Sequence, residues 1–261
     1  RNIDILREAG YGFVDPVEGN LACGTSGKGK MASPERIAAV LETLREQDMK
    51  GVRLVVTAGP TREILDPVRY LTNHSSGKMG YAIARQAANR GADVVLVSGP
   101  SSQAVPVNVT LVPVQSACDM FEAVKQQYTQ ADIIIKAAAV ADYRPINVAD
   151  EKIKKSDSSM SIELEKTDDI LLELGRRRRD GQFICGFSME TENMIENSKK
   201  KLEKKNVDMI AANNLKVEGA GFGTDTNVMT LITKDDIVEL PIMSKESVAD
   251  KILDVIANKI K

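Results

Sequence analysis

From residue 54 onward, short runs of apolar, β-branched residues alternate with amphipathic segments of helical period, and this alternation constrains the fold more than any other feature. The expected strands are 54–57, 94–98, 110–114 and 133–137, and the expected helices are 79–90 and 118–128. Runs of this kind, separated by helices, are typical of parallel strands that are covered on both sides. The pattern therefore predicts an α/β, Rossmann-like open sheet that is mainly parallel, with helices on both faces.

The second half of the chain continues the pattern less regularly. It predicts strands at 162–164, 183–187 and 209–212 and helices at 169–177, 192–205 and 245–260. Two further apolar runs, 228–233 and 237–241, flank the turn Lys234-Asp235-Asp236. A hairpin there would add an antiparallel edge to the sheet.

The first 48 residues differ in composition from the rest. Ser33-Pro34-Glu35 predicts the start of a helix that runs to about Gln47, because a capping hydroxyl precedes a proline at the first helical position. The segment 20–31 contains too much glycine to be core. We expect a domain boundary between residues 1–48 and 49–261, and a chain that begins inside a longer one, because its start resembles neither a signal peptide nor an initiator sequence.

Charge and cysteine content limit the partners. The 35 basic and 37 acidic residues give a net charge of -2, so no global field attracts nucleic acid or an anionic membrane. No apolar run approaches the roughly 20 residues that a membrane-spanning helix needs. The cysteines are odd in number and form no C-x-x-C, which disfavours a disulfide framework or a zinc site and indicates a cytoplasmic protein.

The segment between the first strand and the first helix predicts a phosphate site. Gly59 follows the strand, and Ser75, Gly77 and Gly80 surround the helix start, where free N–H groups and the positive end of the helix dipole favour an anion. The alternative is that Ser75 only caps the helix and the glycines only permit turns. Neither a P-loop nor a G-x-G-x-x-G motif is present, and Gly99 follows the second strand in place of an acidic residue, which disfavours a nicotinamide dehydrogenase.

Residues 137–145 leave a strand at its carboxyl end, the usual place of ligands in open α/β sheets. Ala138 and Ala139 would admit a ligand against the backbone, and Asp142 would accept hydrogen bonds from it. Alanines also pack helices on sheets, so the two alanines alone leave both interpretations open.

Two lysine groups suggest a polyanion. Lys152 and Lys154 project from the same side if their segment is extended. Lys201 and Lys205 share a helix face and repel each other unless something negative lies between them, which hints at a triphosphate. The competing interpretation is a solvated charged surface, and the run 176–179 of four arginines is assigned to the last turn of its helix, where cations complement the dipole.

In combination, these residues resemble a known family. Residues 51–261 are similar to phosphopantothenate–cysteine ligase, the synthetase half of the bifunctional bacterial coenzyme A enzyme, and residues 10–31 resemble the end of its flavin-dependent decarboxylase half. The motifs that carry the resemblance are Gly59-Pro60-Thr61-Arg62-Glu63, Asp66-Pro67-Val68-Arg69-Tyr70, Asn73-His74-Ser75-Ser76-Gly77-Lys78-Met79-Gly80, Ala138-Ala139-Val140-Ala141-Asp142-Tyr143, Lys152-Ile153-Lys154-Lys155, Gly186-Phe187 and Ala212-Asn213.

The resemblance implies a nucleotide site, and the bacterial form of the Lys152–Lys155 segment implies CTP. The positions that match the family's nucleotide-binding residues are Gly59, Ser75, Gly77, Gly80, Lys152, Asp168, Asp169, Ile170, Leu171, Phe187, Lys201, Lys205 and Asn213. Mg²⁺ is implied with the triphosphate, where Lys201 and Lys205 would hold the outer phosphates. Phe187 is equally compatible with a place in the core.

The resemblance also implies the substrates, 4′-phosphopantothenate and L-cysteine, and an acyl-cytidylate intermediate. The substrate would be held by Asn73, Ala138, Ala139 and Asp142, and Arg69 would reach its phosphate across the interface of a homodimer. Asn73 and Lys152 are the expected catalytic residues: Asn73 would orient the acyl-phosphate carbonyl, and Lys152 would face the α-phosphate. Cys23 matches the proton donor of the decarboxylase half, whose FMN-binding part lies outside this sequence.

Two rival classes differ in what they would bind or release. A reductase of related fold would bind a nicotinamide nucleotide and not respond to CTP. A nucleotide-sensing module would bind CTP but never release pyrophosphate.

Overall fold

The computed structural model describes residues 2–20, 25–43, 47–155, 159–190, 193–214, 221 and 223–260. These residues form two compact units, residues 1–46 and residues 47–261. The boundary expected from the sequence lay between residues 48 and 49.

The first unit consists of short elements. They are α1 (Asn2–Glu8), β1 (Val17–Asn20), β2 (Ser26–Lys30) and α2 (Pro34–Thr43). The strands β1 and β2 pair as an antiparallel hairpin within a segment whose glycine content predicted a loop. The hydroxyl of Ser33 accepts the Arg36 N–H at 3.3 Å, as the helix-start signature requires. Cys23 lies outside the described residues.

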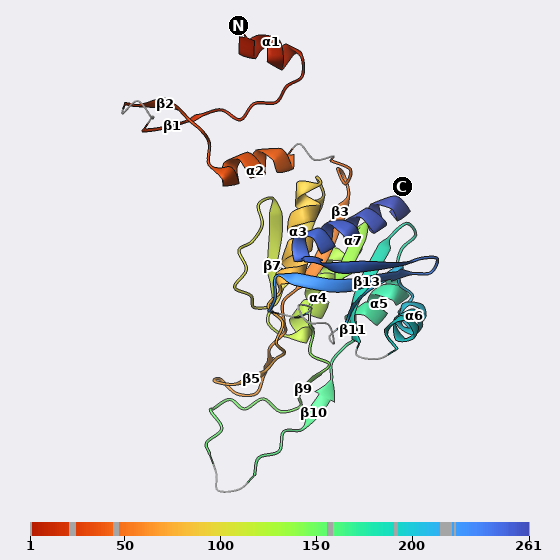
Figure 1. Ribbon diagram of the computed structural model, residues 1–261. Helices are drawn as coiled ribbons and strands as arrows, with labels where there is room; N and C mark the ends of the chain where they lie inside the picture. The colour runs from red at the N-terminus through yellow and green to blue at the C-terminus, as the bar shows by residue number, and fades with distance from the viewer. Residues whose placement is uncertain are drawn as a thin grey trace. The chain divides into compact units, whose positions relative to one another are not determined.

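The second unit is built on one eight-stranded sheet (Figure 1). In spatial order the strands are β14 (Ile237–Ser244), β13 (Thr226–Thr233), β12 (Met209–Asn214), β11 (Phe183–Glu190), β8 (Ile133–Lys136), β3 (Arg53–Ala58), β6 (Asp93–Ser98) and β7 (Val109–Pro113). The strands from β12 to β7 are parallel, and β13 and β14 are antiparallel. The predicted Rossmann-like fold with an antiparallel edge is confirmed.

Helices cover both faces of the sheet because alternate strand residues point to opposite sides. On one face, Leu54 and Val56 of β3 belong to a core formed with α3 (Lys78–Asn89) and α7 (Lys245–Ile260). On the other, Val55 packs with α4 (Ala117–Gln127), α5 (Ile170–Arg177) and α6 (Met194–Lys205). None of the helices in the described part of the chain combines the length and apolarity needed to cross a membrane.

Two small hairpins lie outside the main sheet. They are β4 (Glu63–Ile64) with β5 (Tyr70–Leu71), and β9 (Tyr143–Pro145) with β10 (Leu164–Lys166). The strand predicted at 162–164 is thus shifted to β10. It pairs with β9 instead of joining the main sheet, and all its residues are exposed, so burial gave no pattern to mark its bounds.

Gly80 allows α3 to approach the end of β3 closely. A Cβ atom at this position would lie 2.6 Å from the Ala58 Cβ and 2.9 Å from the Thr57 carbonyl oxygen. Both atoms belong to the backbone of β3 or are bonded directly to it, so moving them aside would cost packing energy in the centre of the sheet. The glycine is therefore required for packing, whatever it also does for a ligand.

We predict that Gly80→Ala lowers the free energy of unfolding by about 1–2 kcal/mol. Overpacking costs about 1–3 kcal/mol, which exceeds the gain of up to about 1 kcal/mol in helix propensity. Urea unfolding measures the effect, with Gly223→Ala as the control because a Cβ there meets nothing within 4 Å. Equal midpoints for the two variants would contradict the packing argument.

Candidate functional site

Two adjoining cavities lie at the carboxyl ends of β8, β11 and β12, where open α/β sheets bind ligands. The first has a volume of about 390 Å³ and the second about 420 Å³, each within the range of small-molecule sites. Their walls have five residues in common: Lys136, Val140, Asp142, Phe187 and Lys201. One elongated ligand could therefore occupy both.

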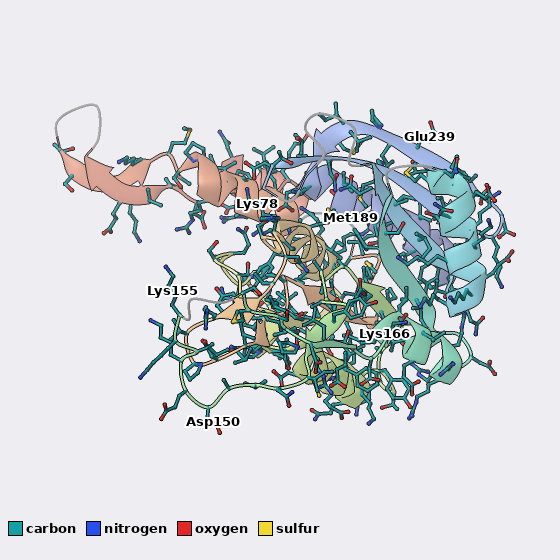
Figure 2. All side chains as sticks on the ribbon, turned by 90° about the horizontal axis from the view of Figure 1, so that it is seen from below. Lys78, Asp150, Lys155, Lys166, Met189 and Glu239 are labelled. Carbon is teal, nitrogen blue, oxygen red and sulfur yellow. The ribbon has the colours of Figure 1, made fainter. Side chains whose placement is uncertain are left out.

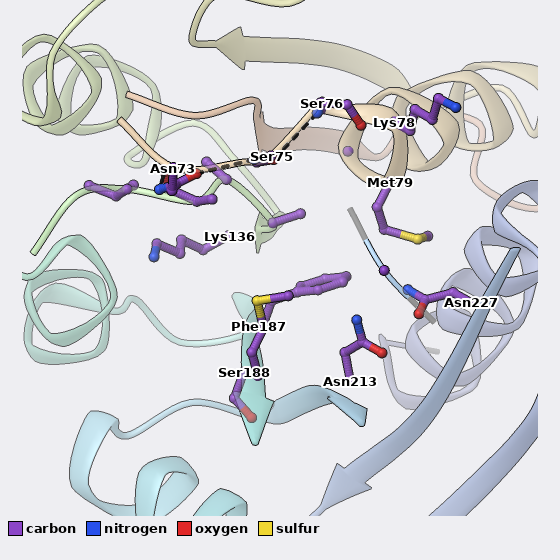
Figure 3. Close-up of a pocket in the computed structure, with 18 of the residues that line it drawn as sticks. Asn73, Ser75, Ser76, Lys78, Met79, Lys136, Phe187, Ser188, Asn213 and Asn227 are labelled. Carbon is purple, nitrogen blue, oxygen red and sulfur yellow. Dashed lines mark hydrogen bonds between the residues drawn. The ribbon is translucent and has the colours of Figure 1, made fainter. Parts of the chain in front are cut away.

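The turn before α3 and the first residues of that helix form one wall of the first cavity (Figure 3). Gly77 precedes the helix with a left-handed φ of 82°, and no side chain caps the helix. The Ser75 hydroxyl accepts the Gly77 N–H at 3.4 Å, so it stabilises the turn and does not cap α3. The first N–H groups of α3 remain available to an anion, as the phosphate-site prediction requires.

The loop after β8 is held in place by hydroxyl and amide groups from other loops. Thr57 Oγ1 accepts the Ala138 N–H, and Thr61 Oγ1 accepts the Ala141 N–H, both at 3.0 Å. Asn73 Nδ2 donates to the Ala139 carbonyl at 2.7 Å, and its Oδ1 accepts the Ser75 N–H at 3.4 Å. Asn73 thus connects the two loops on either side of the first cavity and fixes their separation.

The opposite wall of the first cavity carries an unsatisfied acceptor. Asn213 is only 6% exposed, and its Oδ1 has no hydrogen-bond partner within the described residues. A buried amide oxygen without a partner costs about 1–3 kcal/mol, so such an atom beside a cavity indicates a ligand that donates to it. Phe187 lies between this wall and Lys136 (Figure 3), and its carbonyl accepts from Lys201 Nζ at 3.2 Å.

The second cavity is bounded by the start of α5 and the end of α6. Its wall includes the backbone segment Asp168–Leu171, with Asp169 as the N-cap of α5. Lys205 forms an ion pair with Asp169. Burial acts to raise the pKa of Asp169, but the hydrogen bonds from Lys205 and from the Leu172 N–H lower it overall. The like-charge conflict expected between Lys201 and Lys205 is therefore relieved in part by a carboxylate of the protein itself.

Most of the residues predicted from the sequence line these cavities. Those in the first are Asn73, Ser75, Gly77, Gly80, Ala138, Ala139, Asp142, Phe187, Lys201 and Asn213, and those in the second also include Asp168, Asp169, Ile170, Leu171 and Lys205. Gly59 lies behind the wall. A Cβ there would approach the Gly99 carbonyl oxygen to 2.9 Å, so this glycine permits two loops to meet.

Arg69 and Lys152 lie outside both cavities and are connected to each other through Asp66. Asp66 is 1% exposed and accepts from Arg69 Nη2 at 2.6 Å and from the Ile153 N–H at 3.2 Å. Arg69 Nη2 also donates to the Ile153 carbonyl at 3.1 Å. Lys152, next in the chain, is exposed on the long β9–β10 loop, where Figure 2 labels Asp150 and Lys155.

Several residues of the cavity walls were not predicted. They are Lys136, Ser188, Asn227, Met229 and Lys245, among others. Lys136 had a signal, because a charged residue ends the apolar run Ile133-Ile134-Ile135 at the carboxyl end of a predicted strand. The sequence contains no such signal for Asn227 and Lys245, because only the tertiary structure of the antiparallel edge brings them to the cavity.

The described residues contain no group of three His, Cys, Asp or Glu side chains that could hold a metal ion by themselves. Mg²⁺ in nucleotide sites is held by one or two carboxylates together with the phosphates of the substrate. The protein residues here therefore do not form a metal site of their own.

Comparison with known proteins gives consistent matches. The family model described as the DNA/pantothenate metabolism flavoprotein C-terminal domain matches residues 49–260. The coenzyme A biosynthesis bifunctional protein CoaBC of Bacillus subtilis is 49% identical over 98% of this chain, which spans 64% of that protein's length. A crystal structure of the C-terminal domain of a CoaBC protein is 47% identical, with a TM-score of 0.71 over 82% of this chain and 98% of that one.

A more distant structure shares the fold. A Cab2 variant in complex with phosphopantothenate-cysteine has a TM-score of 0.66 over 88% of this chain and 96% of that chain, at 16% identity. This likeness shows the fold alone.

We predict that the stability contributed by Asp66 depends on pH. Hydrogen bonds, first that from the Arg69 side chain, hold the pKa of Asp66 well below its ordinary value of 3.8. The stabilisation is therefore fully present above about pH 4 and is lost as the pH falls through the lower, folded-state pKa. Asp66→Asn should unfold at lower urea than the wild type at pH 7, and the difference should narrow at pH 3.

The control is Asp150→Asn, which changes an exposed carboxylate on the loop after β9. It should match the wild type at both pH values. A deficit of Asp66→Asn that stays constant between pH 7 and pH 3 would show that the Asp66 charge is not the source of the stabilisation.

Proposed function

This chain belongs to the family of the DNA/pantothenate metabolism flavoprotein C-terminal domain, and we propose that it joins L-cysteine to 4′-phosphopantothenate in a CTP-dependent ligation. The products would be 4′-phosphopantothenoylcysteine, CMP and pyrophosphate, a step of coenzyme A biosynthesis. The name of the Bacillus subtilis relative, of which this chain spans 64%, supports the pathway.

One observation carries the proposal: the uncapped start of α3 and the Lys201 ammonium group line the same pair of connected cavities. Helix N–H groups and ammonium groups together favour a ligand with several negative charges. The volumes of the cavities, about 390 and 420 Å³, suit a nucleoside triphosphate beside a second substrate better than a small anion. Asn213 Oδ1 adds an acceptor for a donor group of either molecule.

The first half of the reaction brings two anions together. A carboxylate oxygen of phosphopantothenate would attack the α-phosphorus of CTP, the bond to the β-phosphate oxygen would break, and pyrophosphate would leave with the electron pair. Since both reactants are negative, positive groups and oriented N–H donors must stabilise the charge that accumulates. We assign this role to the start of α3, to Lys201 and, at the outer phosphates, to Lys205.

The second half joins the amine of cysteine to the activated acyl group. The amine nitrogen would form a bond to the acyl carbon and lose a proton, the bond from that carbon to the phosphate-linked oxygen would break, and CMP would leave with the electron pair. Asn73 is suited to orienting the acyl carbonyl, because its amide is neutral and is already fixed by the bonds to Ala139 and Ser75. The loop from Ala138 to Asp142 would hold phosphopantothenate against its backbone.

Mg²⁺ in this proposal would be bound by oxygen atoms of the triphosphate, since the described residues supply no cluster of three metal-ligating side chains. Residues 1–48 would correspond to the end of a flavin-dependent decarboxylase domain, with Cys23 as its proton donor. FMN would be bound elsewhere in that domain. The match of the family model begins at residue 49, which is consistent with this division.

A homodimer with shared active sites would explain the positions of Arg69 and Lys152. Both lie outside the cavities of their own chain, and the segments that carry them, the β4–β5 hairpin and the β9–β10 hairpin with its loop, also carry exposed apolar side chains. These are Val68, Tyr70, Tyr143, Ile146, Val148, Met160, Ile162 and Leu164. A surface of this kind is typical of an interface, and a second copy that covered it could receive Arg69 and Lys152 in its own cavities.

We predict that the protein releases pyrophosphate only when phosphopantothenate and CTP are both present. Without cysteine, release should stop near one equivalent per site, because the acyl-cytidylate accumulates; with cysteine, release should continue. ATP in place of CTP should react much more slowly. Coupled detection of pyrophosphate measures all of these conditions, and no release with the complete mixture would refute the ligase proposal.

We predict that shared sites allow two inactive variants to restore each other. Mixed dimers of Arg69→Ala and Asn73→Ala chains contain one site in which both residues are intact, so an equal mixture should recover about one quarter of wild-type turnover. The control is a mixture of Lys201→Gln and Asn73→Ala chains. Both of these residues line the cavity of one chain, so every site in that mixture is defective. Recovery no greater than in the control would mean that each chain has a complete site.

A further inference from the structure

Lys136 occupies an unusual place that the function proposed above does not account for. It is the last residue of β8, the strand between β3 and β11, and the three residues before it are fully buried. Its side chain lies on the wall where the two cavities meet, between Asn73 and Phe187 in Figure 3. Within the described part of the chain, no hydrogen bond or ion pair to its ammonium group is present.

The surroundings of Lys136 leave its charge poorly compensated. Burial and, to a smaller extent, the nearby Lys201 ammonium lower the pKa of Lys136 from 10.5 to about 8. Lys205 acts in the same direction, whereas the carboxylates of Asp169 and Asp142 act to raise the pKa. Asp169 already binds Lys205 and accepts the Leu172 N–H, so its charge is shared among several donors.

A lysine in such a site is stabilised when an anion arrives. The lost hydration of the ammonium is costly, and a phosphate oxygen would replace it with a charge-assisted hydrogen bond. Lys201 also lines both cavities and would bind the same anion. The attraction of both ammonium groups to that anion would offset their mutual repulsion.

We propose that Lys136 binds the phosphate of the nucleotide at the junction of the two cavities, the α-phosphate of the ligation, and is a further catalytic residue. This inference depends on the proposed function for the identity of the step. When the carboxylate oxygen attacks and pyrophosphate leaves, negative charge increases on the oxygens of that phosphate, where Lys136 would stabilise it. Lys136 keeps its proton in this step.

Calorimetric titration with CTP tests the contact without reference to turnover. At pH 8.5 the free amine is mostly neutral, and a bound phosphate raises its pKa, so binding should take up as much as about three quarters of a proton per site. The uptake is measured from the heats in two buffers of different ionisation enthalpy. It should be lost in Lys136→Met and retained in Lys125→Met, which changes an exposed lysine on α4.

Turnover separates a catalytic role from a structural one. Lys136→Met should lower kcat by about 100-fold, as does the removal of one transition-state donor elsewhere. Lys136→Arg should recover part of kcat at pH 7 but show no proton uptake at pH 8.5, because its guanidinium stays charged. Proton uptake and kcat that are the same in Lys136→Met and the wild type would overturn the assignment.

The two proposals can fail separately. If CTP binding takes up a proton that Lys136→Met loses, while the wild type releases no pyrophosphate from the complete reaction mixture, the ligase proposal fails and Lys136 remains a phosphate-binding residue. If the wild type is an active ligase and Lys136→Met matches it in both measurements, only the inference about Lys136 fails. Lys136→Arg serves in place of Lys136→Met should the latter not fold.

Discussion

The short loop after β8 is the part on which the site depends. Three hydrogen bonds hold the backbone of Ala138–Ala141: its N–H groups donate to the hydroxyls of Thr57 and Thr61, and the Asn73 amide donates to one of its carbonyls. Each bond is worth only about 1 kcal/mol, but together they fix the distance between this loop and the start of α3. Since that gap forms the first cavity, the geometry available to a ligand is set by side chains that need not touch it.

The fold accumulates positive charge at this end of the sheet. The carboxyl ends of parallel strands gather loops from distant parts of the sequence, and here they bring together the start of α3, Lys136 and Lys201. Of the cations around the second cavity, Lys205 is paired with Asp169, while the pKa of Lys136 is lowered by burial and by Lys201. A protein that only needed stability would gain by an apolar residue at Lys136. The arrangement is explained by a ligand that supplies the missing negative charge.

The sequence predicted those helices and strands in which a buried side makes apolar residues recur at a regular spacing. The strands β3 and β6 and the helix at 245–260 follow the apolar pattern closely, because each has a buried side. The hairpins β4–β5 and β9–β10 are short and largely exposed, so they have no such pattern. Lys136, Asn227 and Lys245 were missed for a different reason: their place in the site depends on the strand order, which periodicity does not reveal.

The sequence places Lys152 on the surface but does not assign it to a binding site. The alternation of residues along this segment correctly predicts that Lys152 and Lys154 are exposed. It does not reveal whether they would contribute to a cavity of their own chain or of a second copy. The hydrogen bonds that Asp66 accepts from Arg69 and from the Ile153 N–H join this loop to the β4–β5 hairpin. In a single chain that surface would expose both apolar side chains and cations that lie outside the cavities. A second copy that covered this surface, as proposed above, would bury the apolar side chains.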